Sequence, residues 1–261
     1  MNGDVGNRLR SRLAGGETAL GTMLFEFNTP GVARILASAK ADFVLIDLEH
    51  TGWSVEGIRP LLAASRRTPT VPIVRVQGSN RHLISGVLDV GAVGVMVPMV
   101  DTGSEAVQVI DAARFLPNGS RGFGLVYADQ LTEGVEQAIA TIESETIVIL
   151  QIETREGLDN VEEIAATPGV DVLWAGLFDL SLALGVPGAV DHPRVRDAEN
   201  RVVAACDQAG IAAGVLAADV ERAQSELDRG FRMIGLSSDI GLMQNALSSG
   251  LAALRPNESR A

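Results

Sequence analysis

The chain has 261 residues, of which 46% are hydrophobic and only 4% are aromatic. This length is near that of one (β/α)₈ barrel, although two ordinary domains would also fit it. The Ala-, Val-, Leu-, Ile- and Gly-rich composition is typical of packed α/β layers. The formal net charge of −12, with no basic run, argues against nucleic-acid and membrane partners.

Eight apolar runs alternate with helical patterns from Ala19 onward, and most are rich in β-branched residues, as strands buried on both faces are. The expected strands are 19–25, 43–49, 71–76, 93–99, 147–153, 172–176, 212–217 and 233–237. Helix starts are expected at Thr29-Pro30, Ser54, Ser79, Ser104 and Asp219. Eight β–α units imply parallel strands with right-handed crossovers, and they favour a closed, single (β/α)₈ TIM barrel over an open sheet.

No linker rich in Pro, Gly or Ser interrupts the pattern, so we expect one domain over 1–261. Residues 1–17 are expected to be an N-terminal extension and 255–261 a C-terminal tail. The polar N-terminus does not resemble a secretory signal, and no window approaches a transmembrane span. The longest irregular stretch, 117–129, is a candidate active-site loop.

Two rare residue types narrow the chemistry. The one cysteine, Cys206, excludes an intrachain disulfide and is consistent with a reducing cytoplasm. The one lysine, Lys40, is expected just before the second strand, at the face of a barrel away from its chemistry. Schiff-base catalysis and a Walker A phosphate loop both need a suitably placed lysine, so both are disfavoured.

Polar side chains interrupt the apolar strands near their carboxyl ends, where barrel enzymes place their active sites. They are Asp47, Glu49 and His50 at the second strand, Arg75 on the third, Gln151 and Glu153 on the fifth, and Asp179 just after the sixth. Buried charges are costly without a partner or a ligand. The set on neighbouring strand ends therefore predicts a functional site.

Each of these residues also has a structural interpretation. Asp179 would cap a short helix over 180–184, and Arg75 would be a buried partner of Asp47. Glu49 would be a structural partner, and His50 would be a hydrogen-bonded turn residue. The structural interpretation explains each residue alone, but it explains their joint position poorly.

Two carboxylates without a Cys/His cluster indicate a hard cation bound by oxygen, such as Mg²⁺ or Mn²⁺. Glu153 and Asp179 are the expected ligands because they come from adjacent strands. A cation held by this pair would keep open positions for a bidentate ligand.

At these residues the chain resembles the HpcH/HpaI aldolase family of class II pyruvate aldolases, whose fold is a (β/α)₈ barrel of the phosphoenolpyruvate/pyruvate type. The resemblance runs from Gly21 to about Leu247. The matching segments include Ile-Asp-Leu-Glu-His at 46–50, Val-Arg-Val-Gln-Gly-Ser at 74–79, Gln-Ile-Glu-Thr at 151–154 and Gly-Leu-Phe-Asp-Leu-Ser at 176–181.

The resemblance implies a role for each site residue. Glu153 and Asp179 resemble the ligands of a divalent cation (Mg²⁺, Mn²⁺ or Co²⁺). His50 resembles the catalytic base, Asp89 resembles the acid that raises the basicity of this histidine, and Asp47 resembles a supporting acid. Arg75 resembles the group that stabilises the enolate, and the positions that resemble substrate contacts are Gln151, Gly176, Phe178 and Asp179. For Asp89 the alternative is an ordinary exposed helix acid. The resemblance also implies a homo-oligomer, commonly a hexamer.

The implied reaction is reversible retro-aldol cleavage of a 4-hydroxy-2-oxo acid to pyruvate, or a related 2-oxo acid, and an aldehyde. Leu177-Phe178 departs from the family's usual Gly-Pro-Ala-Asp turn, and Tyr127 lies near a tyrosine found in relatives that act on oxaloacetate. An oxaloacetate decarboxylase or a related enolate-forming lyase or synthase is therefore an alternative. A non-catalytic oxo-acid-binding protein is the alternative of another class.

Overall fold

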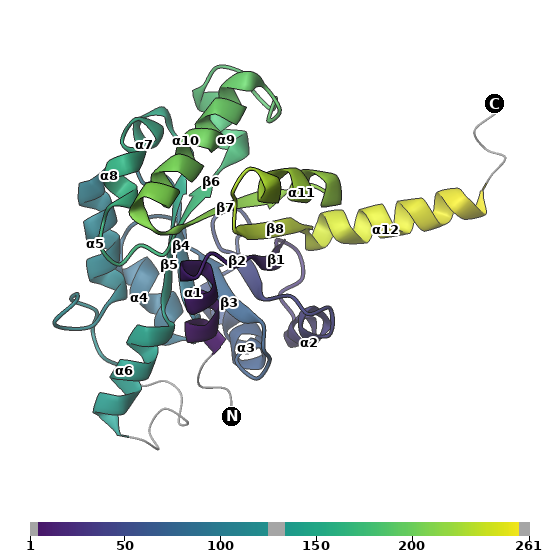
Figure 1. The fold of residues 1–261 in the computed structure, drawn as a ribbon. Coiled ribbons are helices and arrows are strands. Elements are labelled where there is room, and N and C mark those ends of the chain that lie inside the picture. The colour runs from purple at the N-terminus through teal and green to yellow at the C-terminus, as the bar shows by residue number, and fades with distance from the viewer. Residues whose placement is uncertain (1–4, 125–133, 256–261) are drawn as a thin grey trace.

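Eight parallel strands close into a barrel in sequence order, with β1 paired to both β2 and β8 (Figure 1). The computed structural model describes residues 5–124 and 134–255. The strands are β1 (Ala19–Leu24), β2 (Phe43–Asp47), β3 (Val71–Arg75), β4 (Gly94–Val97), β5 (Ile147–Ile152), β6 (Val172–Ala175), β7 (Ala212–Ala217) and β8 (Met233–Ser238). All eight lie where the apolar runs predicted them, which confirms the TIM-barrel prediction.

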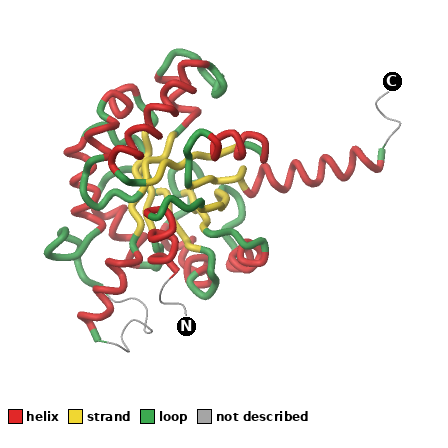
Figure 2. The backbone as a smooth tube through the Cα atoms, viewed as in Figure 1, coloured by secondary structure: helices red, strands yellow, loops and turns green. Residues whose placement is uncertain are grey.

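Helices surround the strands, which occupy the centre of the molecule (Figure 2). They are α1 (Val5–Ala14), α2 (Pro30–Ser38), α3 (Val55–Ser65), α4 (Arg81–Asp89), α5 (Gly103–Ala113), α6 (Val135–Glu145), α7 (Arg155–Asp159), α8 (Val161–Ala165), α9 (Leu177–Ala183), α10 (Pro193–Ala209), α11 (Val220–Asp228) and α12 (Asp239–Leu254). Two apolar layers result. One fills the barrel and includes Phe43, Leu45 and Trp174, and the other lies between the strands and the helices.

Local capping explains most helix starts. The side chains of Ser54 and Asp219 cap α3 and α11 as predicted, by accepting from backbone N–H groups within the first turn. The expected caps Ser79 and Ser104 were wrong. Asn80 caps α4 in place of Ser79, and Thr102 caps α5 in place of Ser104. Asn and Thr are also favourable N-cap residues, and each lies one or two positions before or after the expected serine.

The expected N-terminal extension contains α1, which packs on the barrel. Its Leu9 and Leu13 are buried in the layer that fills the barrel. Arg10 donates to Asp171, the residue before β6, at 2.6 Å. This helix therefore closes the amino-terminal face and leaves the carboxyl ends of the strands for the site.

The last helix, α12, extends away from the barrel, whereas the other helices that follow strands lie along it (Figure 1). Its apolar side chains Ile240, Met243, Leu247, Leu251 and Leu254 are exposed. Their spacing of three or four residues places them on one stripe of the helix. No helix in the described part of the chain is both long and apolar enough to cross a membrane.

Candidate active site

A cavity of about 510 Å³ opens at the carboxyl ends of the strands. Six of the predicted site residues line this one cavity: His50, Arg75, Gln151, Gly176, Phe178 and Asp179. Its apolar wall is formed by Met23, Phe25, Met96, Trp174 and Leu216. The cavity thus offers both polar groups and apolar surface to a small molecule.

The carboxylate of Asp47 is the centre of the hydrogen bonds around strands β2 and β3. It is fully buried and accepts from Arg75 Nε at 2.7 Å, from Glu49 N at 3.1 Å and from His50 N at 3.0 Å. Asp47 and Arg75 are direct register partners across the two strands. Asp47 therefore orients the guanidinium of Arg75, and its contact with the backbone N–H of His50 fixes the turn that carries this histidine.

Glu49 joins the buried Arg75 to the exposed His50. Its Oε2 lies 3.2 Å from Arg75 Nε and 3.6 Å from His50 Nε2. Burial raises the pKa of the Glu49 carboxyl, while the positive charge of Arg75 opposes that rise. The His50 ring, whose side chain is 60% exposed, is free to meet a ligand in the cavity.

The carboxylate of Glu153 is buried next to Gln151 and Gly176, which line this cavity, whereas Glu153 itself is not among the lining residues. Its Oε1 accepts from Met99 N at 2.8 Å, and its Oε2 accepts from Gln151 Nε2. Met99 follows β4 with φ 51°, a left-handed conformation that costs energy in a residue with a side chain. Burial, followed by the negative charge of Glu49, raises the pKa of Glu153 to about 7.

Gly176 lies against the same carboxylate. A Cβ at this position would stand 2.6 Å from Glu153 Oε2 and 2.9 Å from Gln151 Nε2, closer than real Cβ atoms come. Only glycine therefore lets the start of α9 approach Glu153. Gln151 Oε1 is buried without a hydrogen-bond partner among the described residues, and an acceptor left in this way suits a bound ligand.

Asp179 is the third residue of α9, and its side chain makes no N-cap hydrogen bond, so the alternative interpretation of Asp179 as a helix cap was wrong. Phe178 is 68% exposed and stands in the cavity lining, and the cavity remains open beside it. Burial is the main cause of the raised pKa of Glu49 and of Glu153, and the negative charge of Asp179 adds a smaller rise to the pKa of each.

This donor set fits a hard divalent cation. Glu153 and Asp179 offer carboxylate oxygens, and a cation would offset the burial and the carboxylate repulsion that raise the pKa of Glu153. Among the described residues no group of three or more His, Cys, Asp or Glu side chains is placed to hold a metal ion. Two protein carboxylates with remaining positions for water or substrate is a common arrangement for Mg²⁺.

Asp89 lies apart from these residues within one chain. It ends α4 and pairs with Arg121 at 2.7 Å, beside Val93 and Thr146, which precede β4 and β5. This is the amino-terminal face of the barrel, whereas His50 lies at the carboxyl-terminal face. The structure therefore does not bring Asp89 to His50 within one chain. Tyr127 and residues 125–129 of the expected active-site loop lie outside the described residues.

Several residues around the cavity were not singled out from the sequence, and two of them hold or line it with charged side chains. The carboxylate of Asp239 accepts from the backbone N–H groups of Phe25, Glu26 and Phe27, and so fixes the loop after β1. Arg222 lines the outer end of the cavity from the first turn of α11. Both residues lie in helices that follow strands, so neither interrupts an apolar strand run in the sequence. The strand pattern therefore gives no signal for them.

Residues 22–246 match the HpcH/HpaI aldolase/citrate lyase family. A "Hydroxypyruvate/pyruvate aldolase" of Chromohalobacter salexigens is 39% identical over 221 residues, which cover 84% of this chain and 87% of that relative. A "2-keto-3-deoxy-L-rhamnonate aldolase" of Escherichia coli K12 is 33% identical over 99% of this chain and 97% of its own length.

A solved structure supports the same relationship over the whole barrel. The crystal structure of an HpcH/HpaI aldolase/citrate lyase family protein from Burkholderia cenocepacia superposes with a TM-score of 0.89 at 34% identity, and covers 95% of this chain and 99% of its own. The matched region contains every site residue described above. The chain belongs to the HpcH/HpaI aldolase/citrate lyase family.

Proposed function

We propose that this protein is a divalent-metal-dependent aldolase that cleaves a 4-hydroxy-2-oxo acid to pyruvate, or a related 2-oxo acid, and an aldehyde. The observation that carries this proposal is the buried Arg75, which is held by Asp47 and Glu49 and lines a cavity with His50, Gln151 and Asp179. The aldolase names of the two relatives support the same reaction class.

Glu153 and Asp179 would hold the cation, and Gly176 would let them approach one another. When bound, the cation supplies Lewis-acid stabilisation of negative charge on the 2-oxo group. The lone lysine, Lys40, follows α2 and precedes β2, at the amino-terminal face. An amine-based alternative at the cavity therefore has no lysine to use.

The side chains of the cavity account for the proton and charge movements. The His50 imidazole takes the proton of the 4-hydroxyl group, and the C4 carbonyl forms as the C3–C4 bond breaks. The electron pair of that bond moves into the enolate of the 2-oxo acid, where the Arg75 guanidinium stabilises the negative charge on oxygen. Return of a proton to C3 gives pyruvate.

Pyruvate release from a panel of 4-hydroxy-2-oxo acids, measured through lactate dehydrogenase, tests this function. We expect turnover with Mg²⁺, Mn²⁺ or Co²⁺, and a loss of about 10²–10³-fold in kcat for Arg75→Ala, as for removal of one oxyanion donor. Arg201→Ala is the matched control, because Arg201 is in an exposed pair with Glu162. Absence of metal-dependent pyruvate with every substrate would refute the proposal. Turnover that depends on Arg75 would exclude a non-catalytic binding protein.

We also propose that the chain forms a homo-oligomer through α12. The outward-facing Leu20 of β1 is 47% exposed and Ile35 of α2 is 64% exposed, next to the side of the barrel that α12 leaves uncovered. The apolar stripe of α12 from a second copy would cover such a surface, because exposed apolar patches of this kind mark interaction sites. Burial of both surfaces in one contact would stabilise a symmetric pair.

A further inference from the structure

The cavity of the candidate active site has a second polar end. Beyond the apolar wall that includes Trp174 and Leu216, it is lined by Asp191, Asp219 and Arg222. These residues come from the loop before α10 and from the start of α11, so they lie on the same face as Arg75. A substrate whose 2-oxo acid lies at Arg75 would point its other end toward them.

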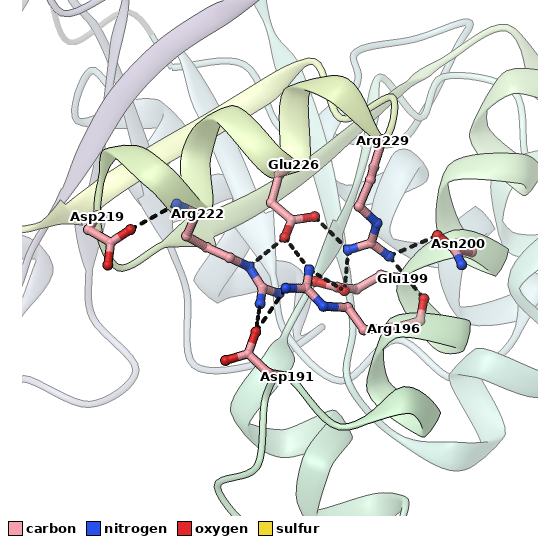
Figure 3. A network of polar contacts seen from close by, with 8 residues as sticks. All are labelled: Asp191, Arg196, Glu199, Asn200, Asp219, Arg222, Glu226 and Arg229. Carbon is pink, nitrogen blue, oxygen red and sulfur yellow. Dashed lines mark hydrogen bonds and ion pairs between the residues drawn. The ribbon is translucent and has the colours of Figure 1, made fainter.

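Arg222 is held in one position by a network of charges (Figure 3). Its Nη2 donates to Glu199 Oε1 at 2.7 Å, its Nε contacts Glu226, and its Nη1 donates to Asp191. Glu199 and Glu226 are fully buried and are also paired with Arg196 and Arg229. The guanidinium is therefore a fixed donor, and it does not need to reorganise when a ligand arrives.

Asp191 differs from the other carboxylates of this network, because its side chain is 75% exposed. It accepts from both Arg222 and Arg196, and it lines the cavity. Asp219 adds a second exposed carboxylate there, fixed by the hydrogen bond from Arg222 N at 2.8 Å. The outer end of the cavity thus presents two carboxylates and one guanidinium whose three edges are already paired.

This charge balance separates two classes of aldehyde. A terminal carboxylate on the substrate would face Asp191 and Asp219, and would have to displace Asp191 to reach Arg222. A hydroxyl group can donate to either aspartate and leave the pairs of the guanidinium intact. The arrangement therefore suits an uncharged, hydroxylated chain and opposes an anionic one.

We propose that Asp191, Asp219 and Arg222 are specificity-determining residues that select a neutral hydroxyaldehyde as the second reactant. The inference rests on the aldolase function proposed above. It assigns to these three side chains the discrimination between hydroxyaldehydes and semialdehydes that end in a carboxylate.

The test measures carbon–carbon bond formation from pyruvate and Mn²⁺ with glyceraldehyde or with succinic semialdehyde, by chromatography of the products. We expect kcat/KM to favour glyceraldehyde by at least about tenfold. Asp191→Asn and Asp219→Asn should each raise kcat/KM for succinic semialdehyde relative to glyceraldehyde by about tenfold, mainly through KM. Asparagine retains the N-cap of α11 in the second variant.

Asp159→Asn is the matched control, because Asp159 is an exposed aspartate paired with an arginine, Arg201, outside the cavity. Its preference should equal that of the unchanged protein. A preference for succinic semialdehyde, or a ratio that neither cavity variant changes, would overturn the inference while the aldolase function stands. Failure to join pyruvate to any aldehyde would refute the aldolase function itself.

Discussion

The Nε of Arg75 donates to Oδ1 of Asp47 at 2.7 Å, between residues that are direct partners in the register of β2 and β3. The same carboxylate accepts from the backbone N–H groups of Glu49 and His50. Asp47 is fully buried, so these donors compensate the carboxylate for its lost hydration. One carboxylate therefore supports both the proposed enolate-stabilising group and the proposed base.

Replacement of this carboxylate should cost both stability and activity. Asp47→Ala leaves the buried Arg75 with Glu49 as its remaining ion-pair partner among the described residues, and we expect the free energy of unfolding to fall by about 3 kcal/mol. Glu162→Ala, which breaks the exposed pair with Arg201, should change it by less than about 1 kcal/mol. Urea denaturation measures both. Equal effects of the two substitutions would contradict the central role of Asp47.

Gly176→Ala should abolish activity without unfolding the protein. The added Cβ would meet Glu153 and Gln151 at less than 3.0 Å, so the proposed cation ligands would have to separate. Gly86→Ala is the control, because Gly86 lies within α4 and a Cβ there meets nothing within 4 Å. We expect the control to retain activity and to gain about 0.5–1 kcal/mol of stability. Mn²⁺ affinity by calorimetry should fall only for Gly176→Ala, and unchanged affinity would refute the close-approach argument.

The pKa of Glu153, raised from 4.5 to about 7, predicts a pH dependence of the metal-free protein. Between these values the folded state binds a proton that the unfolded state has released, so stability falls as pH rises through this window, by roughly 1.4 kcal/mol per pH unit. Glu153→Gln removes this contribution.

Urea denaturation in EDTA at several pH values from about 5 to 8 measures the difference between the two proteins. The stability of Glu153→Gln relative to the unchanged protein should grow with pH up to about 7 and then level off. Parallel profiles would contradict the raised pKa. Added Mn²⁺ should remove the loss in the unchanged protein alone, because a cation favours the ionised carboxylate.

The sequence predicted the barrel well because its strands are buried on both faces, which leaves unbroken apolar runs such as Phe43–Asp47. It also predicted the group around Arg75, since polar residues at strand ends interrupt those runs. The separation of Asp89 from His50 could also have been predicted, because Asp89 ends the helix before β4 and so lies at the amino-terminal face, as Lys40 does before β2. The family resemblance alone had placed Asp89 beside His50.

The outer end of the cavity could not be predicted from the sequence. Asp191 and Arg222 are separated by the whole of α10 and β7, and they meet only through the crossovers of the fold. The sequence also did not predict that α12 extends away from the barrel. An apolar stripe predicts that a helix packs against something, but it does not identify the surface.

Substitution of that stripe should change the oligomeric state. Leu247 is 56% exposed and lies at the middle of the stripe between Met243 and Leu251, so Leu247→Glu would place a charge where a second copy is proposed to pack. Asn245→Glu adds the same charge to the opposite face of the same helix. By size-exclusion chromatography with light scattering, we expect the control to keep the mass of the unchanged oligomer and Leu247→Glu to lower it.

A single-chain mass for the unchanged protein, or an equal effect of both substitutions, would show that the stripe does not mediate assembly. Because the helix leaves the barrel after Asp239, the barrel of Leu247→Glu should retain its fold, which circular dichroism would report separately from the change in mass.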